Sequence, residues 1–228
     1  MTNTEILRAA LWDMDGTLID SGEYHWLSWQ GVLAAEGRPI TRDEFAATFG
    51  QRNDTILRGW FSADLPDAEV MRISNVKEAR YRDLVREHGI ELLPGVRHWI
   101  ERLHDEGWRQ AVASSAPLEN IRTILAVMEI ESFFDTLVSA EHVQRGKPDP
   151  QVFLLAAEGV GVPPARCVVV EDAPAGLEAG QRAGMRTIGV RSSHRNLHAD
   201  IVVDTLDQLP DDAFERLTEP QRTQRPQR

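Results

Sequence analysis

Short apolar runs alternate along the chain with longer stretches in which polar and apolar residues recur at helical spacing. The six runs with strand character are Ala9–Trp12, Gln110–Ala113, Thr136–Val138, Cys167–Val170, Thr187–Val190 and Ile201–Val203. Short strands that are buried on both faces and separated by helices are typical of a parallel sheet with helices on either side. The pattern therefore predicts an α/β fold.

The first two predicted strands are separated by about a hundred residues, and this interval has helical rather than strand signals. Thr41 and Glu44 have the spacing of a capping box, and helical periodicity follows over 55–62 and 67–88. We therefore predict a helical cap, inserted after the first strand, over residues 21–92. The sheet and its flanking helices then form a core from residues 1–20 and 93–217.

The N-terminal residues 1–10 have neither the apolar core nor the small-residue cleavage site of a leader peptide. No stretch approaches the roughly 20 apolar residues that a transmembrane helix needs. Residues 218–228 contain no apolar side chain, which predicts a disordered tail. We expect a soluble, cytoplasmic monomer.

The net charge of −11 argues against a general nucleic-acid or anionic-membrane surface, because such surfaces need clustered basic residues. A small anion in a local positive pocket is compatible with this charge. Only Lys77 and Lys147 of the 25 basic residues are lysines. A chain that otherwise uses arginine suggests, chance aside, that these two positions need a compact ammonium group.

Two carboxylates, Asp13 and Asp15, follow directly after the first predicted strand, and Gly16 comes next. Ligands of open α/β sheets bind at the carboxyl ends of the strands. Two acids at that edge repel each other unless a cation offsets their charge, and Mg²⁺ is the natural counter-ion beside a phosphate. A surface turn is the alternative; a calcium loop is excluded because Leu11 stands where it needs a ligand.

Three further segments carry candidate chemistry. Ser114 and Ser115 end the second strand, and Pro117 suits the first position of a helix. Hydroxyl and free N–H groups at this helix start could seat a phosphate or simply cap the helix. Lys147 precedes a predicted helix and could offset charge on a phosphoryl group, the alternative being a solvated loop lysine. Glu171 and Asp172 end the strand at 167–170, so they would converge with the first acidic pair if the two strands are neighbours.

In this order, the four segments resemble the four motifs of the haloacid dehalogenase-like superfamily: D-x-D-G-T, a strand-terminal Ser or Thr, a loop Lys and a closing acidic pair. The resemblance spans the core from Leu11 to Val190 and implies a Rossmann-like parallel sheet. It implies an aspartyl-phosphate mechanism in which Asp13 is the nucleophile and Asp15 the general acid and base.

The same resemblance assigns the remaining roles. Ser114, with Ser115 beside it, would bind phosphoryl oxygens, and Lys147 would bridge the phosphoryl group and the nucleophile. Mg²⁺ would be held by Asp13, the backbone carbonyl of Asp15 and Asp172. Glu171 is left open between a direct and an indirect role at the metal.

The helical cap resembles that of the β-phosphoglucomutase and phosphoglycolate phosphatase branch. On this resemblance His25, Arg52 and Lys77 are candidate substrate-binding residues of the cap, with a surface role the alternative for His25. The arginine that binds phosphate in the mutase has its counterpart at Asn53, one place after Arg52. A Ser-Lys pair of the mutase is replaced by Ala116 and Pro117.

Three functions follow as hypotheses. The first is a Mg²⁺-dependent phosphatase, a phosphoric monoester hydrolase acting on a small phosphorylated metabolite such as a sugar or polyol phosphate. The second is a β-phosphoglucomutase, an isomerase. The third is a catalytically idle binding protein on the same fold, which is disfavoured because an idle site has no physical need to keep so many like charges together. The loss of mutase-like phosphate contacts favours the phosphatase.

Overall fold

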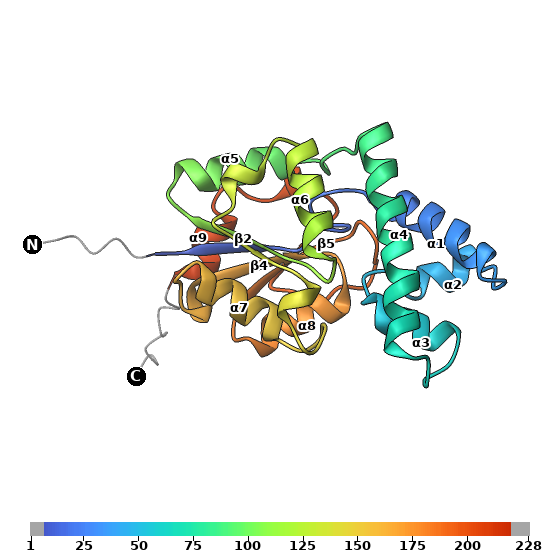
Figure 1. Cartoon of the computed structure of the whole chain (residues 1–228). Coiled ribbons are helices and arrows are strands. Elements are labelled where there is room, and N and C mark those ends of the chain that lie inside the picture. The colour runs from blue at the N-terminus through green and yellow to red at the C-terminus, as the bar shows by residue number, and fades with distance from the viewer. Residues whose placement is uncertain (1–6, 220–228) are drawn as a thin grey trace, which may run out of the picture.

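The computed structural model describes residues 7–219 and contains a six-stranded parallel sheet (Figure 1). The strands are β1 (Ala9–Trp12), β2 (Arg109–Ala113), β3 (Thr136–Val138), β4 (Cys167–Glu171), β5 (Arg186–Val190) and β6 (Ile201–Val203). Their order in the sheet is β3-β2-β1-β4-β5-β6. The central strand β1 pairs with β2 on one side and β4 on the other, so all three strands end at the same edge.

Helices cover both faces of the sheet (Figure 1). One face packs against α5 (Val96–Asp105), α6 (Leu118–Val127) and α9 (Ala213–Thr218), and the other against α7 (Gln151–Gly159) and α8 (Pro174–Arg182). Side chains of β1 alternate between the two layers: Ala10 and Trp12 face the first, and Ala9 and Leu11 the second. The strand is apolar throughout because both of its faces are buried.

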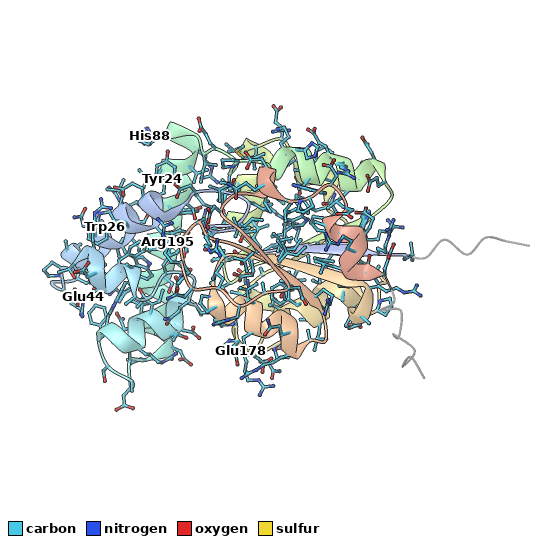
Figure 2. All side chains as sticks on the ribbon, turned by 180° about the vertical axis from the view of Figure 1, so that it is seen from behind. Tyr24, Trp26, Glu44, His88, Glu178 and Arg195 are labelled. Atoms are coloured by element: carbon cyan, nitrogen blue, oxygen red, sulfur yellow. The ribbon has the colours of Figure 1, made fainter. Side chains whose placement is uncertain are left out.

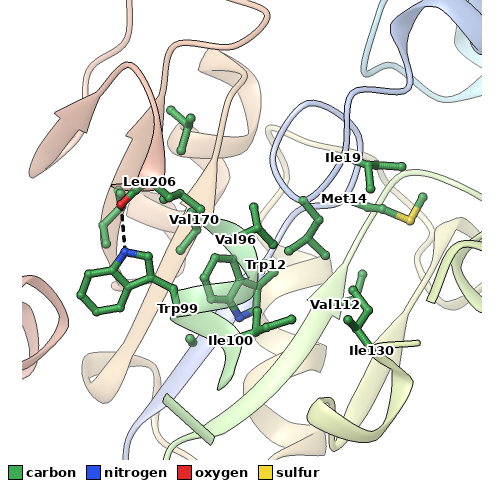
Figure 3. Close-up of a cluster of buried hydrophobic side chains, with 14 of the residues drawn as sticks. Trp12, Met14, Ile19, Val96, Trp99, Ile100, Val112, Ile130, Val170 and Leu206 are labelled. Carbon is green, nitrogen blue, oxygen red and sulfur yellow. Dashed lines mark hydrogen bonds between the residues drawn. The ribbon is translucent and has the colours of Figure 1, made fainter. Parts of the chain in front are cut away.

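The larger hydrophobic core lies on the face covered by α5, α6 and α9. Figure 3 shows Trp12 and Trp99 close together in this cluster, with Val170 of β4 beside them. The indole N–H of Trp99 donates to the carbonyl of Leu206 at 2.8 Å, so this buried polar group is satisfied. The residues of β1 are fully buried, so packing on both faces positions the residues that follow the strand.

Between β1 and α5 the chain forms four helices, which Figure 1 shows as a separate lobe beside the sheet: α1 (Gly22–Ala35), α2 (Arg42–Ala46), α3 (Asn53–Trp60) and α4 (Asp67–His88). We call this lobe the cap. Its own core contains Trp26, Trp29, Leu33 and Leu57, with Trp60 packed against it. The labelled cap residues Tyr24, Trp26 and Glu44 lie well away from Glu178 of α8 in Figure 2.

The structure confirms the α/β fold, all six predicted strands and the helical insertion. The predicted capping box forms, since the Thr41 hydroxyl accepts from the Glu44 N–H and the Glu44 carboxylate accepts from the Thr41 N–H. Pro117 lies one place before α6 rather than at its first position, because its ψ of 148° is extended. Most of the predicted disordered tail, residues 218–228, lies outside the described residues.

Candidate active site

A cavity of about 500 Å³ lies between the carboxyl edge of the sheet and the cap. Residues that follow β1, β2 and β4 line its floor, and cap residues from α1, α3 and α4 line its walls. It contains every residue predicted as a catalytic, metal or substrate-binding group: Asp13, Asp15, His25, Arg52, Lys77, Ser114, Ser115, Lys147 and Asp172. Both lysines of the chain are therefore in one cavity.

Three buried carboxylates, those of Asp13, Glu171 and Asp172, meet at the floor of the cavity, each offering an oxygen within 4.8 Å of the others. They meet because β1 and β4 are neighbouring strands that end together. Gly16 makes room for this cluster: its φ is +88°, and a Cβ there would lie 2.3 Å from an Asp172 carboxylate oxygen. The D-x-D-G spacing thus serves both the turn and the packing of Asp172.

Lys147 is the cation inside this cluster. Its ammonium donates to Asp13 at 2.5 Å and to Glu171 at 2.8 Å, and its side chain is 6% exposed. The other Glu171 oxygen accepts from the Ala173 N–H at the start of α8. Glu171 therefore holds Lys147 against Asp13, a contact that the sequence left open.

Burial and mutual repulsion make the carboxylate cluster hard to ionise. Burial raises the pKa of Asp13 well above its ordinary value, although Lys147 opposes the change. Burial, together with the charge of Glu171, raises the pKa of Asp172 to about 7. One ammonium group does not balance three carboxylates, so a further cation is needed for all three to be charged at neutral pH.

The donor set fits a hard divalent cation. The three converging side chains offer only carboxylate oxygens, the ligand type that Mg²⁺ prefers, and they carry the excess negative charge that such an ion would neutralise. Asp15 does not join them through its side chain, which turns toward the cap. Its predicted contact through the backbone carbonyl stays a prediction.

Asp15 and His25 form the first link between floor and cap. The Asp15 carboxylate accepts from the Ser21 hydroxyl at 2.5 Å and lies 3.1 Å from Nε2 of His25. Burial alone would raise the pKa of Asp15, but the neighbouring His25 and the Ser21 hydroxyl leave it below its ordinary value. Asp15 is thus an ionised carboxylate, whereas the ionisation of Asp13 is suppressed.

His25 in turn contacts Lys77 of α4, whose ammonium lies 2.7 Å from Nδ1 of His25. An ammonium group can only donate, so Nδ1 accepts and the ring carries its proton on Nε2, where it donates to Asp15. The ring also stacks on Tyr81, with centroids 4.1 Å apart. His25 is therefore held in one orientation from both sides, which favours a site role over the alternative of a surface residue.

Glu78, which the sequence pattern did not single out, is the partner of Lys77. Its carboxylate accepts from the Lys77 ammonium at 2.8 Å and from the Asn53 amide at 2.7 Å. The second oxygen accepts from Asn120 of α6, at 2.5 Å, and so joins the cap to the core. In the sequence, Glu78 lies in a predicted helix between a lysine and an alanine, and no local feature distinguishes it from a solvent-exposed helix residue.

Arg52 also joins the cap to the core. Its guanidinium donates to the backbone carbonyls of Ala140 and Val143 at 3.2 and 3.1 Å and pairs with Asp54 at 3.2 Å. Arg52 lines the cavity, but these contacts occupy much of its hydrogen-bonding capacity. Arg52 therefore bridges the cap and the core, and its role in substrate binding stays a prediction.

Ser114, three aromatic rings and His194 complete the lining of the cavity. Ser114 is 2% exposed, and its hydroxyl accepts from the Ala116 N–H at 3.1 Å, which orients it at the end of β2. The aromatic rings of Trp29, Phe45 and Phe49 form an apolar part of the cap wall. His194 of the loop after β5 lines the rim as well, although no strand-terminal pattern marks it in the sequence.

Comparison with known proteins places this arrangement in a family. Residues 10–190 match the model of the haloacid dehalogenase-like hydrolases. The chain belongs to this family. It is 34% identical over 217 residues to hexitol phosphatase B of Escherichia coli (strain K12), covering 92% of this chain and 97% of that protein. It is 32% identical over 203 residues to β-phosphoglucomutase of Bacillus subtilis (strain 168), covering 86% and 89%.

A solved structure shows the same architecture. The structure of a CbbY variant from Rhodobacter sphaeroides in complex with xylulose-(1,5)bisphosphate superposes with a TM-score of 0.83, at 27% identity over 89% of this chain and 96% of that one. The relatives to which the chain is similar thus include a phosphatase and a mutase. Within residues 7–219, no helix combines the length and apolar character needed to cross a bilayer.

Proposed function

We propose that this enzyme is a Mg²⁺-dependent phosphatase that hydrolyses a small sugar or polyol monophosphate through a phosphorylated Asp13. The observation that carries the proposal is the contact of the Asp13 carboxylate with the Lys147 ammonium at 2.5 Å, in a cavity that also holds Asp15 and Ser114. Relatives named as hexitol phosphatase and phosphorylated carbohydrates phosphatase support the substrate class.

Asp13 attacks phosphorus in the first step, and the bond from phosphorus to the leaving oxygen breaks. Lys147 and Glu171 position the attacking carboxylate, and Ser114 and Ser115 bind phosphoryl oxygens. Mg²⁺ held by Asp13, Asp172 and the Asp15 carbonyl would neutralise charge that builds up on the phosphoryl group. We place Glu171 behind this set, because both of its oxygens already accept hydrogen bonds.

Asp15 moves the protons in both steps. The incoming phosphoryl group brings negative charge close to Asp15, which raises its pKa and lets it carry the proton that the leaving oxygen receives. Having lost that proton, Asp15 takes one from the water that attacks the aspartyl phosphate. His25 orients Asp15 through the contact of 3.1 Å.

A panel of phosphorylated metabolites tests this proposal. Sugar, polyol and two-carbon phosphates are incubated with the enzyme in Mg²⁺ and in EDTA, and inorganic phosphate is measured. We expect Mg²⁺-dependent release, fastest from sugar or polyol monophosphates. Absence of release from every member of the panel in Mg²⁺ would count against a phosphatase.

A β-phosphoglucomutase is the second candidate, favoured by the contact between His25 and Asp15 and by the similar enzyme of B. subtilis. A mutase retains a bisphosphorylated intermediate and therefore needs a second anion site. Asn53 is uncharged and already bonded to Glu78, and Ala116 and Pro117 offer neither a hydroxyl nor a cation.

A direct assay separates the two activities. The enzyme is given β-glucose 1-phosphate, a trace of the 1,6-bisphosphate and Mg²⁺, and both free phosphate and glucose 6-phosphate are measured. We expect mainly free phosphate. Efficient formation of glucose 6-phosphate with little free phosphate would show a mutase instead.

A further inference from the structure

Lys77 is the cap ammonium group nearest to the catalytic floor, and it is buried at 1% exposure between aromatic rings. Its nitrogen lies 5.3 Å from the ring centroids of both Trp29 and Tyr81. Through His25 it is only one side chain away from Asp15. An uncompensated charge at this place would attract a second phosphate group of a substrate.

Glu78 removes that excess charge. It is 5% exposed and its carboxylate lies 2.8 Å from the Lys77 ammonium. Burial would raise the pKa of Glu78, but the charge of Lys77 and the hydrogen bonds that Glu78 accepts leave it below its ordinary value. The two side chains therefore form a neutral ion pair within the cap wall.

The rest of the cap wall is neutral as well. Arg52 is paired with Asp54, and Asn53 presents an amide whose N–H donates to Glu78. Phe45 and Phe49 add apolar surface. Such a wall matches the hydroxyl groups and carbon skeleton of a sugar or polyol, and it offers poor compensation for a second phosphate dianion.

We infer that Glu78 is a specificity-determining residue, which neutralises Lys77 and so restricts the substrate to one phosphoryl group. This inference rests on the proposed phosphatase function. It identifies the residue that discriminates monophosphates from bisphosphates. A bisphosphate must either leave its second phosphate unpaired or separate Lys77 from Glu78, and both cost free energy in a buried site.

The test compares two ligands that differ by one phosphoryl group. Binding of glucose 6-phosphate and glucose 1,6-bisphosphate is measured by calorimetry with Mg²⁺, in full-length chains that carry Asp13→Asn to prevent turnover. Glu78→Gln keeps the size of the side chain and frees the Lys77 charge. We expect the ratio of bisphosphate to monophosphate affinity to rise about tenfold or more, the effect of one charge-assisted contact.

Two matched variants isolate the charge effect. Glu36→Gln makes the same change of charge on the exposed surface of the cap, where Glu36 pairs with Arg72, and should leave the ratio unchanged. Lys77→Gln combined with Glu78→Gln keeps the pair neutral, so its ratio should not rise. The double variant leaves no unpaired buried charge. It therefore provides a folded chain for the affinity measurement should Glu78→Gln alone fail to fold.

Each outcome has a separate meaning. An unchanged ratio in a folded Glu78→Gln chain, or a rise in the doubly neutral variant, would overturn the inference. Phosphate release from glucose 6-phosphate by the chain with Asp13 intact is measured in parallel. If phosphate is released but the affinity ratio is unchanged in Glu78→Gln, only the role of Glu78 is rejected. If the affinity ratio shifts but no monophosphate is hydrolysed, the phosphatase function is rejected and the charge-compensating role of Glu78 is retained.

Discussion

At the scale of single residues, the two aspartates after β1 differ in what surrounds their carboxylates. Asp13 lies among Lys147, Glu171 and Asp172, whereas Asp15 accepts from Ser21 and His25. The surroundings raise the pKa of Asp13 and lower that of Asp15. The proposed roles need the opposite states, an ionised Asp13 and a protonated Asp15. Mg²⁺ beside Asp13 would lower the first pKa and a phosphoryl group beside Asp15 would raise the second, so the bound ligands and not residue type would set the two roles.

Replacement of Asp13 by asparagine should abolish turnover and leave the fold intact. The amide keeps the shape of the side chain but cannot attack phosphorus, so we expect phosphate release to fall about a thousandfold or more. Release is measured on the best substrate of the panel, and circular dichroism checks the fold. Activity within a few-fold of the parent enzyme would contradict the mechanism.

Lys147→Arg should be severely impaired although it keeps the positive charge. The ammonium contacts Asp13 and Glu171 in a buried space with 6% side-chain exposure, where a planar guanidinium does not fit without moving a carboxylate. Loss of a charge-assisted contact predicts a decrease in kcat/KM of about ten- to a hundredfold.

Arg145 provides the matched control for this substitution. It lies in the same loop, its side chain is 78% exposed, and it pairs with Asp149 at the surface. Arg145→Lys exchanges the same two residue types and should leave kcat/KM unchanged. Equal effects of the two substitutions would show that the loop, and not the buried ammonium, is responsible.

At the scale of elements, the first turn of α8 is built around the Glu171 carboxylate. A Cβ on Gly176 would lie 1.7 Å from an oxygen of Glu171. Gly176→Ala should therefore displace Glu171 and, through it, Lys147, lowering kcat/KM as well as stability. Overpacking of this kind typically costs about 1–3 kcal/mol. Thermal unfolding and steady-state kinetics measure the two effects.

Gly59 of α3 offers a contrasting helical glycine. A Cβ there meets nothing within 4 Å among the described residues, and its φ is not positive. Gly59→Ala should stabilise the chain by about 0.4–1 kcal/mol, because it reduces the conformational entropy of the unfolded state. The pair of variants separates a steric requirement from helix propensity: similar shifts in unfolding temperature for both would refute the packing argument.

At the scale of the whole molecule, the carboxylate cluster predicts that stability depends jointly on pH and Mg²⁺. The pKa of Asp172 is about 7 in the folded chain and its ordinary value is 3.8. Between these values the folded state binds more protons than the unfolded state, so without metal the free energy of unfolding should fall as pH rises from about 4 to 7.

Binding of Mg²⁺ should oppose this loss, because the ion needs the deprotonated carboxylates and binds only the folded state. We expect the stabilisation by a fixed Mg²⁺ concentration to be larger at pH 8 than at pH 6. At a hundred times the dissociation constant it amounts to about 2.7 kcal/mol. Urea unfolding in Mg²⁺ and in EDTA at both pH values provides the measurement, and an equal effect at both would argue against titration of the cluster.

The sequence by itself determined the strands, the cap insertion and the positions of the core site residues. Buried parallel strands show as short apolar runs, and the residues that follow them meet at one edge whatever covers the sheet. Asp13, Ser114, Lys147 and Asp172 could therefore be placed in one site from their order along the chain, and the structure brings all four into one cavity.

The tertiary structure alone decided the contacts between cap and floor. Glu78 meets Asn120 across 42 residues of sequence, and Arg52 reaches the carbonyl of Ala140 across 88. Which face of α4 points into the cavity depends on how the cap packs on the core, and no local pattern encodes that angle. In the sequence, a glutamate next to a lysine in a helix looks like a solvated residue. Burial of Glu78 between the cap and the core makes it the counter-charge of Lys77.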